Sequence, residues 1–405
     1  MSEKKKLILM SPMLHQGGFE RVCITTARLL EPHFDITIVI FDSANIAYDV
    51  EGLKIIDIHM GVKKNKLGKL WNILRRTRKV RSLKKQIKPD IVYSFGPTAN
   101  MINAFSKTGK EKVWLGLRNY TDVEETLKMK LFTKFADLIV CCSKDIEKDV
   151  KIKFGFNKTA VLYNLYDVKA IREEAESKEP ELPWDEIDEN GKKLKILLSM
   201  GRDDDMKGFW HMIKAFSLIH KEVPESRLIL LGAGSFAYYR KLAGELGIAD
   251  AVHFAGMQRE PYKYLKKGEI YLLTSQNEGF PNALVEGMVL GLAPVSVNCL
   301  TGPAEILTED GDTRKLADEL QKLEKDNKTP VIYGEYGIVL PEMEKERDLN
   351  PEHISEEEKR FADVVVALLS DESLLRQYKQ AAAKRAQCFS YEKYQEEFLE
   401  LSRQC

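Results

Sequence analysis

The sequence has few cysteines, and their spacing argues against a disulfide framework and a zinc site. The six of them contain no CxxC pair, and the seven histidines form no HExxH motif. The cysteines are Cys23, Cys141, Cys142, Cys299, Cys388 and Cys405. Scattered thiols are typical of a chain kept reduced in the cytoplasm. The GxSxG elbow of hydrolases and the Walker lysine loop are also absent from the sequence.

Neither a long apolar run nor an excess of one charge is present. No stretch approaches the roughly 18 apolar residues of a membrane span, and the short apolar run after Lys6 is predicted as a strand, not as a signal sequence. With 62 basic and 62 acidic residues, the formal net charge is zero. We therefore expect no nucleic-acid partner. The expected location is the cytoplasm, with peripheral attachment to the inner face of the membrane left open.

Length and composition indicate two domains. The 405 residues, 44% of them hydrophobic, can bury two cores. Apolar runs such as Lys112–Leu117 and Lys195–Met200 alternate with amphipathic stretches, which predicts two Rossmann-like, doubly wound α/β domains. The stretch Glu173–Glu189 carries nine acids and separates them. The predicted parts are a first domain over 1–168, an acidic linker over 169–192, a second domain over 193–385 and a C-terminal helix over 386–405.

The stretch "PNALVEGM", Pro281–Met288, opens a short helix, and six residues separate it from a strand-like run that ends at Thr274. Proline suits the first position of a helix because its missing N–H group has no partner there in any case. The free amides of Asn282, Ala283 and Leu284 would then point out of the helix start. Such amides form an anion cradle, so the sequence predicts a phosphate site here.

Two glutamates flank this cradle, Glu278 before the turn and Glu286 one helical turn after it. Carboxylates repel phosphate but accept hydrogen bonds from pairs of hydroxyl groups, as the acid on ribose does in dinucleotide folds. The pattern therefore indicates a ligand with phosphate in its middle and polyols at both ends. The alternative is that both acids only cap and solvate a helix start.

The loop "GRDDDMKG", within Ser199–Trp210, also lies between a strand and a helix pattern. Arg202 and Lys207 could converge on the same phosphates and neutralise a leaving diphosphate; the alternative is a charged surface loop. Asp203 and Asp205 match the Asp-x-Asp spacing of a known metal-binding motif, but three successive aspartates are more typical of turn caps. We expect no metal here.

Two loops of the first half are weaker candidates. Gly17 and Gly18, in "HQGGFER", separate the first strand from the first helix, where backbone must come close to a ligand. Arg118 and Asn119 lie just past another strand, where the first could bind an anion and the second a hydroxyl group. The alternative for each is a loop contact without a ligand.

The stretch 63–88 has 12 Lys or Arg residues and no acid. A basic amphipathic helix with tryptophan can lie on anionic lipid, so an anionic membrane surface is one predicted partner. The alternative is a helix that packs its apolar stripe on the core. The stripe residues are Leu67, Leu70, Trp71, Leu74 and Ile87.

These motifs together resemble family 4 retaining glycosyltransferases, over about residues 6 to 402. That family has the GT-B architecture, in which two Rossmann-like domains face each other across a cleft. Its signature is a pair of glutamates eight positions apart, which Glu278 and Glu286 match. The loops "GRDDDMKG" and "HQGGFER" resemble its glycine loops. The resemblance also implies that the C-terminal helix 386–405 packs back on the first domain.

The resemblance implies roles for the candidate residues. Arg202 and Lys207 would hold the donor diphosphate. Glu278 would accept hydroxyls of the transferred sugar, and Glu286 those of the ribose. The catalytic candidates are thus Arg202, Lys207 and Glu278. The other implied donor-binding residues are Gly17, Gly18, Met257, Gln258, Gly279, Phe280, Pro281, Asn282 and Ala283. Arg118 and Asn119 stand where many relatives carry a histidine, which makes them acceptor-side candidates. Thr308–Tyr336 is longer than in simple members.

The implied reaction is a metal-independent, retaining transfer of a hexose-type sugar from a nucleotide sugar, with UDP-sugar favoured over GDP-sugar. The acceptor would be a glycan or a lipid-linked glycan of cell-surface polysaccharide synthesis, and no cofactor is expected besides the donor substrate. Two alternatives are a sugar-nucleotide epimerase of the same fold and a catalytically silent binding subunit of a glycan-assembly complex.

Overall fold

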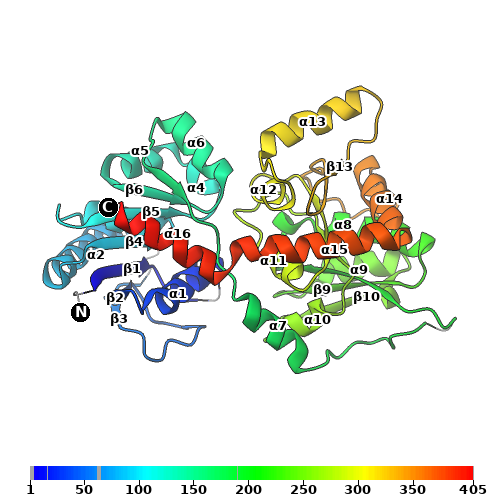
Figure 1. The fold of residues 1–405 in the computed structure, drawn as a ribbon, viewed down its shortest axis with the longest axis horizontal. Coiled ribbons are helices and arrows are strands. Elements are labelled where there is room, and N and C mark those ends of the chain that lie inside the picture. The colour runs from blue at the N-terminus through cyan, green and yellow to red at the C-terminus, as the bar shows by residue number, and fades with distance from the viewer. Residues whose placement is uncertain (1–3, 16, 62–64, 189, 405) are drawn as a thin grey trace. The chain divides into compact units, whose positions relative to one another are not determined.

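The computed structural model describes residues 4–15, 17–61, 65–188 and 190–404. The chain forms two compact units, the first made of Met1–Leu165 with Tyr391–Cys405 and the second of Tyr166–Ser390 (Figure 1). Each unit is an α/β layer structure with its own parallel sheet and its own core.

The first unit contains a seven-stranded parallel sheet in the order β3-β2-β1-β4-β5-β6-β7. Its strands are β1 (Lys5–Ser11), β2 (Phe34–Ile40), β3 (Ile55–Asp57), β4 (Ile91–Phe95), β5 (Lys112–Leu117), β6 (Leu138–Cys141) and β7 (Thr159–Val161). Alternate residues of β1 enter different cores: Leu7 and Leu9 pack on one face, Ile8 and Met10 on the other. This two-sided burial explains the continuous apolar run at the start of the sequence.

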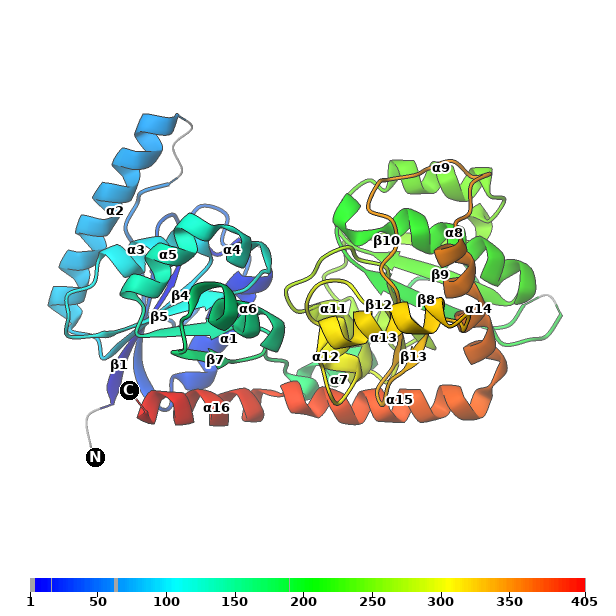
Figure 2. The ribbon, with the colours of Figure 1, turned by 90° about the horizontal axis from the view of Figure 1, so that it is seen from above.

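Helices cover both faces of this sheet (Figure 2). They are α1 (Gly18–Leu30), α2 (Lys66–Ile87), α3 (Pro97–Phe105), α4 (Thr121–Glu124), α5 (Thr126–Phe135), α6 (Lys144–Phe154) and α16 (Tyr391–Arg403). The C-terminal helix α16 buries Tyr394 and Phe398 in the core of the first unit, and the Tyr394 hydroxyl lies 2.9 Å from the Thr26 Oγ1 atom. The predicted return of this helix to the first domain is therefore confirmed.

The helix α2 is longer than the strands beside it. Its 22 residues span about 33 Å, whereas the five residues of β4 span about 17 Å. The amino-terminal half of α2 thus extends past the other helices of the first unit (Figure 2). The predicted apolar stripe of this segment divides: Ile87 packs against the core, whereas Leu70, Trp71 and Leu74 are exposed. Residues 63 and 64 of the predicted basic stretch lie outside the described residues.

The second unit contains a seven-stranded sheet in the order β10-β9-β8-β11-β12-β14-β13, parallel except for β13. Its strands are β8 (Lys195–Met200), β9 (Ser226–Leu231), β10 (Val252–Gly256), β11 (Ile270–Leu273), β12 (Ala293–Val297), β13 (Ile332–Tyr333) and β14 (Ile338–Leu340). Its helices are α7 (Val168–Ser177), α8 (Phe209–Glu222), α9 (Ala237–Glu245), α10 (Tyr262–Leu265), α11 (Asn282–Val289), α12 (Pro303–Leu307), α13 (Thr313–Lys325), α14 (Glu356–Ser370) and α15 (Glu372–Ala386).

Two charged segments of the second unit are more ordered than a solvated linker or insertion. The predicted linker begins within α7, which buries Ile171 and Ala175. Within the longer stretch 308–336, α13 buries Leu316 and Leu320. Across the described ranges, every helix is either too short or too polar to span a bilayer.

Candidate functional site

The carboxyl ends of β8 and β11 lie side by side at the point where the strand order of the second sheet reverses. In open α/β sheets, ligands bind outside the strand ends at such a switch point. The loop after β8 contains Arg202 and Lys207, and the loop after β11 contains Glu278. Thr274 joins the two loops, because its hydroxyl donates to the carbonyls of Lys207 (3.1 Å) and Gly208 (3.0 Å).

The structure brings Lys207 and Glu278 together. The Lys207 Nζ atom donates to Glu278 Oε1 at 2.6 Å, and the two side chains are only 24% and 11% exposed. The two predicted catalytic groups, 71 positions apart in the sequence, therefore form one ion pair at the switch point. Gly208 makes this approach possible: it has a φ of +60°, and a Cβ atom there would lie 2.3 Å from the Thr274 carbonyl oxygen.

Arg202 does not join this pair. Its side chain is 79% exposed, and its nearest acid is Asp204, with 3.8 Å between Nη2 and Oδ2. The neighbouring aspartates serve the turn: Asp203 Oδ2 accepts from the Phe236 amide at 2.8 Å, and Asp204 Oδ1 accepts from the Met206 amide at 3.0 Å. Within the described part of the chain, no three acidic, histidine or cysteine side chains gather as a metal site.

A second glycine, outside the predicted set, shapes the same loop. Gly232 ends the run after β9 with a φ of +146°, and a Cβ atom there would lie 1.7 Å from the Gly201 carbonyl oxygen. The strand end therefore has to be glycine for the loop of Arg202 to pass above it. In the sequence, Gly232 gives only a weak signal, because a single pair of glycines after a strand is common.

The helix α11 begins one residue later than predicted. Pro281 is the N-cap with a ψ of 92°, so Asn282 is the first helical residue. The prediction of a free Leu284 amide is wrong, because that amide donates to the Pro281 carbonyl at 3.1 Å. The Pro281 carbonyl thus occupies the Leu284 amide, which is no longer available to the predicted cradle. Ala283 lies in this first turn, half-buried.

Side chains of the second unit fix the residues before α11. The Gly279 carbonyl accepts from Thr301 Oγ1 at 3.0 Å, and the Phe280 ring packs edge-on against Phe389. Asn282 Oδ1 accepts from the Tyr166 hydroxyl at 2.6 Å. These three contacts tie the turn and the start of α11 to other segments of the second unit.

Glu286 lies on α11 and is buried, with 2% of its surface exposed. Its charge and that of Glu278 both act on the buried Tyr271 hydroxyl, whose pKa is raised first by burial and then by these two carboxylates. One phenol thus lies within electrostatic range of both signature glutamates. Tyr271 also accepts a hydrogen bond from the Met200 amide at 3.1 Å, which ties the end of β8 to the same point. Sequence reasoning missed this tyrosine, because it reads as an ordinary strand residue.

The implied donor-binding residues Met257 and Gln258 follow β10, two strands away from β8. Met257 is 54% exposed, and Gln258 folds back so that its Nε2 atom donates to the Ala255 carbonyl at 2.6 Å. Both lie after a strand end of the same sheet edge.

In the first unit, the candidate loops also follow strand ends. Gly17 is held by Tyr48, whose hydroxyl accepts from the Gly17 amide at 3.0 Å and donates to its carbonyl at 2.7 Å. Gly18 is the first residue of α1. Glu20 lies in the first turn of α1 and is buried; its Oε2 atom has no hydrogen-bond partner among the described residues, and burial raises its pKa.

The first unit itself binds both terminal nitrogens of Arg118, whereas the Nε atom is buried without a hydrogen-bond partner among the described residues. The guanidinium donates to Asn164 Oδ1 at 3.1 Å and to the Tyr93 hydroxyl, and it lies over the Phe95 ring at 5.4 Å. Asn119 is exposed, and its Oδ1 atom accepts from the Thr121 amide at 3.3 Å. Arg118 therefore has a clear structural role, while Asn119 faces solvent at the strand end.

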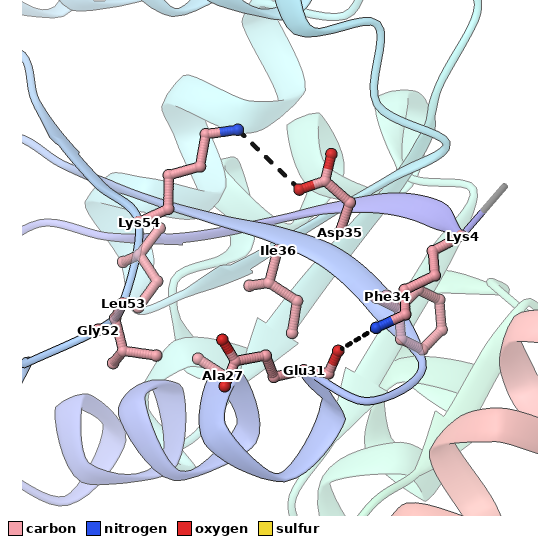
Figure 3. A pocket seen from close by; sticks show the side chains of 10 residues that line it. Lys4, Ala27, Glu31, Phe34, Asp35, Ile36, Gly52, Leu53 and Lys54 are labelled. Atoms are coloured by element: carbon pink, nitrogen blue, oxygen red, sulfur yellow. Dashed lines mark hydrogen bonds and ion pairs between the residues drawn. The ribbon is translucent and has the colours of Figure 1, made fainter.

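A cavity of about 310 Å³ in the first unit lies away from these loops (Figure 3). It is lined by Lys4, Ala27, Glu31, Phe34, Asp35, Ile36, Ile38, Gly52, Leu53 and Lys54. Phe34 begins β2, so the cavity lies at the amino-terminal end of that strand. It is not part of the candidate site, because ligands of open α/β sheets bind at the carboxyl ends.

Replacing Asp122 by asparagine is expected to stabilise the protein at neutral pH. Asp122 is buried beside the Arg118 amide, which donates to its Oδ2 atom at 3.2 Å. Burial raises the pKa of Asp122 to about 6. A raised carboxyl pKa favours folding below the unfolded value near 3.8, and this contribution is lost as the pH rises through 6. The asparagine side chain keeps an acceptor oxygen without the charge, so we expect a gain of about 1–3 kcal/mol at pH 7.5 and little change at pH 3.5.

Urea unfolding of both proteins at the two pH values measures this difference. Asp318→Asn, at an exposed position of α13, is the control and should change stability by less than about 0.5 kcal/mol at either pH. An equal effect of Asp122→Asn at both pH values contradicts the prediction.

Two family models match the chain, one in each half. The Glycosyltransferase Family 4 model matches residues 16–170, and the Glycosyl transferases group 1 model matches residues 183–340. An uncharacterized glycosyltransferase of Methanocaldococcus jannaschii is 29% identical over 82% of this chain and 84% of its own length. An N-acetylgalactosaminyltransferase of Campylobacter jejuni, whose name gives a diphospho-undecaprenol acceptor, is 24% identical over 76% of this chain and 84% of its own length.

Solved structures share the whole fold. HepE from Anabaena, solved with UDP, superposes with a TM-score of 0.70 over 99% of this chain and 100% of its own, at 16% identity. TarM superposes with a TM-score of 0.71 over 98% of both chains, at 13% identity. The predicted α/β fold of GT-B type is confirmed by these matches and by the two Rossmann-like sheets.

Proposed function

Because the chain belongs to the family 4 and group 1 glycosyltransferases, we propose that it moves a hexose-type sugar from a UDP-sugar to a glycan or lipid-linked acceptor. The proposed setting is cell-surface polysaccharide synthesis, and the proposed transfer retains the anomeric configuration. The lipid-linked acceptor named for the Campylobacter relative and the UDP bound to HepE support the choice of substrates. GDP-sugar is the alternative donor.

The observation that carries this proposal is the Lys207–Glu278 ion pair at the switch point, with buried Glu286 on the adjoining helix. A cation and a carboxylate side by side can separate when a donor enters. Lys207 would then bind the diphosphate, and Glu278 would accept hydrogen bonds from sugar hydroxyls. Glu286, eight positions on, would accept the ribose hydroxyls at the other end of the diphosphate.

In the proposed reaction, an acceptor hydroxyl oxygen bonds to the anomeric carbon on the face that the diphosphate leaves. The bond from this carbon to the diphosphate oxygen breaks with its electron pair, and that oxygen takes the proton of the acceptor hydroxyl. The chain supplies position and charge. Lys207 and the amides before Leu284 would neutralise the leaving group, and Arg202 would add a second cation by moving inward from its exposed position.

Nucleotide binding by wild type and Glu286→Gln tests the proposal. We expect calorimetry to show UDP binding by wild type and about 10- to 100-fold weaker binding by the variant, since a hydrogen bond to a charged acceptor contributes about 1.5–3 kcal/mol. Glu324→Gln, at an exposed position of α13, is the control and should bind UDP as wild type does. Equal UDP affinity in Glu286→Gln removes its ribose role. Absence of thermal stabilisation of wild type by UDP-sugars and GDP-sugars alike contradicts the whole proposal.

A further inference from the structure

The outward face of α2 exposes large apolar side chains that the core does not use. The exposed fractions are 59% for Leu70, 57% for Trp71 and 45% for Leu74. The helix packs on its unit through a different face, which carries buried Asn72, Arg76 and Val80 at intervals of four. Packing within the described chain therefore leaves these three apolar residues in water, which has a cost unless another surface covers them.

The exposed apolar residues of α2 lie on the same helix face as three of its cations. Trp71, Leu74, Arg78, Arg81 and Lys85 are separated by three, four, three and four positions, a spacing that keeps them on one helix face. We name these five residues, together with Leu70 one turn before Leu74, the outer stripe; it is apolar in Leu70, Trp71 and Leu74 and cationic in the other three.

The charge on α2 is unbalanced. The helix has nine Lys or Arg residues and no acid. The exposed cations are Lys69, Arg75, Arg78, Lys79, Arg81 and Lys85. Among the described residues, none of these six forms an ion pair with an acid of the chain, in contrast to Lys84 on the inner face, which pairs with Glu111. The surface is complementary to a partner that presents many negative charges beside apolar groups.

We propose that the outer stripe docks the first unit on an anionic phospholipid bilayer. Trp71 and its leucine neighbours would enter the boundary between headgroups and acyl chains, where tryptophan is favoured. Arg78, Arg81 and Lys85 would meet the phosphates of the headgroups. An anionic bilayer satisfies both halves of the stripe at once, because its apolar interior lies directly beneath a layer of phosphates. The docking itself does not rest on the proposed sugar transfer; only its benefit for a lipid-linked acceptor does.

The position of the outer stripe within the first unit would bring the acceptor-side loops close to the membrane. Because α2 runs back from the end of β3 to the start of β4, its apolar amino-terminal end lies at the carboxyl edge of the sheet. The loops of Gly17 and Asn119 follow strands that end at the same edge. A bilayer under the outer stripe would thus hold the acceptor-side loops near the surface from which a lipid-linked acceptor is supplied.

Sedimentation with lipid vesicles tests this inference. The probe is the full chain mixed with vesicles of pure phosphatidylcholine or of phosphatidylcholine with phosphatidylglycerol at a mole fraction of about 0.3, which gives the negative surface potential of an anionic leaflet. We expect wild type to bind only the anionic vesicles, and binding to weaken as salt is raised. The variant Leu70→Ser/Trp71→Ser/Leu74→Ser should bind at least about tenfold more weakly. The variant Arg78→Glu/Arg81→Glu/Lys85→Glu should bind about 100-fold more weakly.

Two control variants carry the same chemical changes elsewhere. Leu127→Ser/Ile152→Ser removes apolar side chains that are 81% and 67% exposed on other helices of the unit, and Lys221→Glu/Lys241→Glu/Lys328→Glu reverses three exposed charges of the second unit. Both should bind vesicles as wild type does, and all variants should keep UDP affinity. Failure of wild type to bind anionic vesicles, or unchanged binding by both stripe variants, overturns the inference. So does lipid-free self-association of wild type that the serine variant abolishes, since the stripe would then be an interface between copies.

Discussion

Replacing Lys207 by alanine is expected to lower kcat for sugar transfer by about 10³-fold, because removing one group that neutralises a leaving anion typically costs about 10²–10³. We expect a larger fall in activity than from removing an ordinary contact to phosphate, because Lys207 also neutralises Glu278. Glu278 is 11% exposed and has the Lys207 ammonium at 2.6 Å. Without the lysine, this carboxylate faces the diphosphate unpaired and repels it.

A double variant separates the two causes. In Lys207→Ala/Glu278→Gln the repulsion is absent, so donor affinity should recover towards wild type while kcat stays low. Lys221→Ala, at an exposed position near the end of α8, is the control and should change neither kcat nor KM. Steady-state kinetics with a UDP-sugar donor measure the split between kcat and KM. A kcat for Lys207→Ala within about threefold of wild type removes Lys207 from the diphosphate site, since that is far below the expected loss.

The fold was predictable because its local signals agree with one another. The strands predicted over Lys112–Leu117 and Lys195–Met200 are β5 and β8 without a change of bounds, since continuous apolar runs between helical patterns are typical of parallel sheets. The two-residue strand β13 was not predicted. It is antiparallel and half-exposed, so it lacks the apolar run on which the other predictions rest.

The site was predictable in its residue types more than in its contacts. The spacing of Glu278 and Glu286 indicated a common ligand, but no local pattern indicates that Lys207 and Glu278 touch, since their contact depends on the pairing of β8 with β11. Arg202 shares a loop with Lys207, yet it faces solvent. The Leu284 amide is lost from the predicted cradle because it donates to the Pro281 carbonyl, a contact that no local pattern in the sequence indicates.

The two faces of α2 also show that residue types were predictable from the sequence whereas contacts were not. Its apolar residues predicted a stripe, and either lipid or core could have covered it. The inner face is instead partly ionic: Lys84, whose side chain is fully buried, pairs with Glu111 at 3.2 Å and donates to the Asn103 Oδ1 atom at 2.8 Å. A lysine on a basic helix is normally solvated, so no local pattern in the sequence indicates that Lys84 is buried. Only the acid brought in by the loop before β5 makes its burial tolerable.

Replacing Glu111 by glutamine is expected to destabilise the protein by about 3–5 kcal/mol, because breaking a buried ion pair leaves one charge uncompensated. Burial lowers the pKa of Lys84 to about 8 even with Glu111 beside it. Without that carboxylate, the folded state would hold Lys84 neutral. Relative to an unfolded pKa near 10.5, losing the proton at pH 7 costs about 5 kcal/mol at most, which agrees with the range from ion-pair mutants.

The pH dependence of stability shows whether the neutral, buried Lys84 causes the loss of stability in Glu111→Gln. In wild type, Lys84 is protonated in both folded and unfolded chains below a pH of about 8, so this residue gives no slope between about pH 6 and 8. In Glu111→Gln, the unfolded chain binds one proton more, and stability should rise by about 1.4 kcal/mol for each pH unit in that window. Urea unfolding measures the slope. Glu245→Gln, in an exposed pair with Lys241, should cost less than about 0.5 kcal/mol without a slope.

A double-mutant cycle then shows whether the pair itself is responsible. Lys84→Met alone leaves Glu111 with its bonds from the Thr108 amide (3.1 Å) and hydroxyl, so its carboxylate stays partly satisfied and the loss should be smaller than for Glu111→Gln. In Lys84→Met/Glu111→Gln no charge is buried, and the loss should fall at least about 2 kcal/mol short of the sum of the single variants. Additive losses would mean that the two residues act through separate contacts. In that case the ion pair does not hold α2 against its sheet, and the inner face of this helix depends on its apolar residues alone.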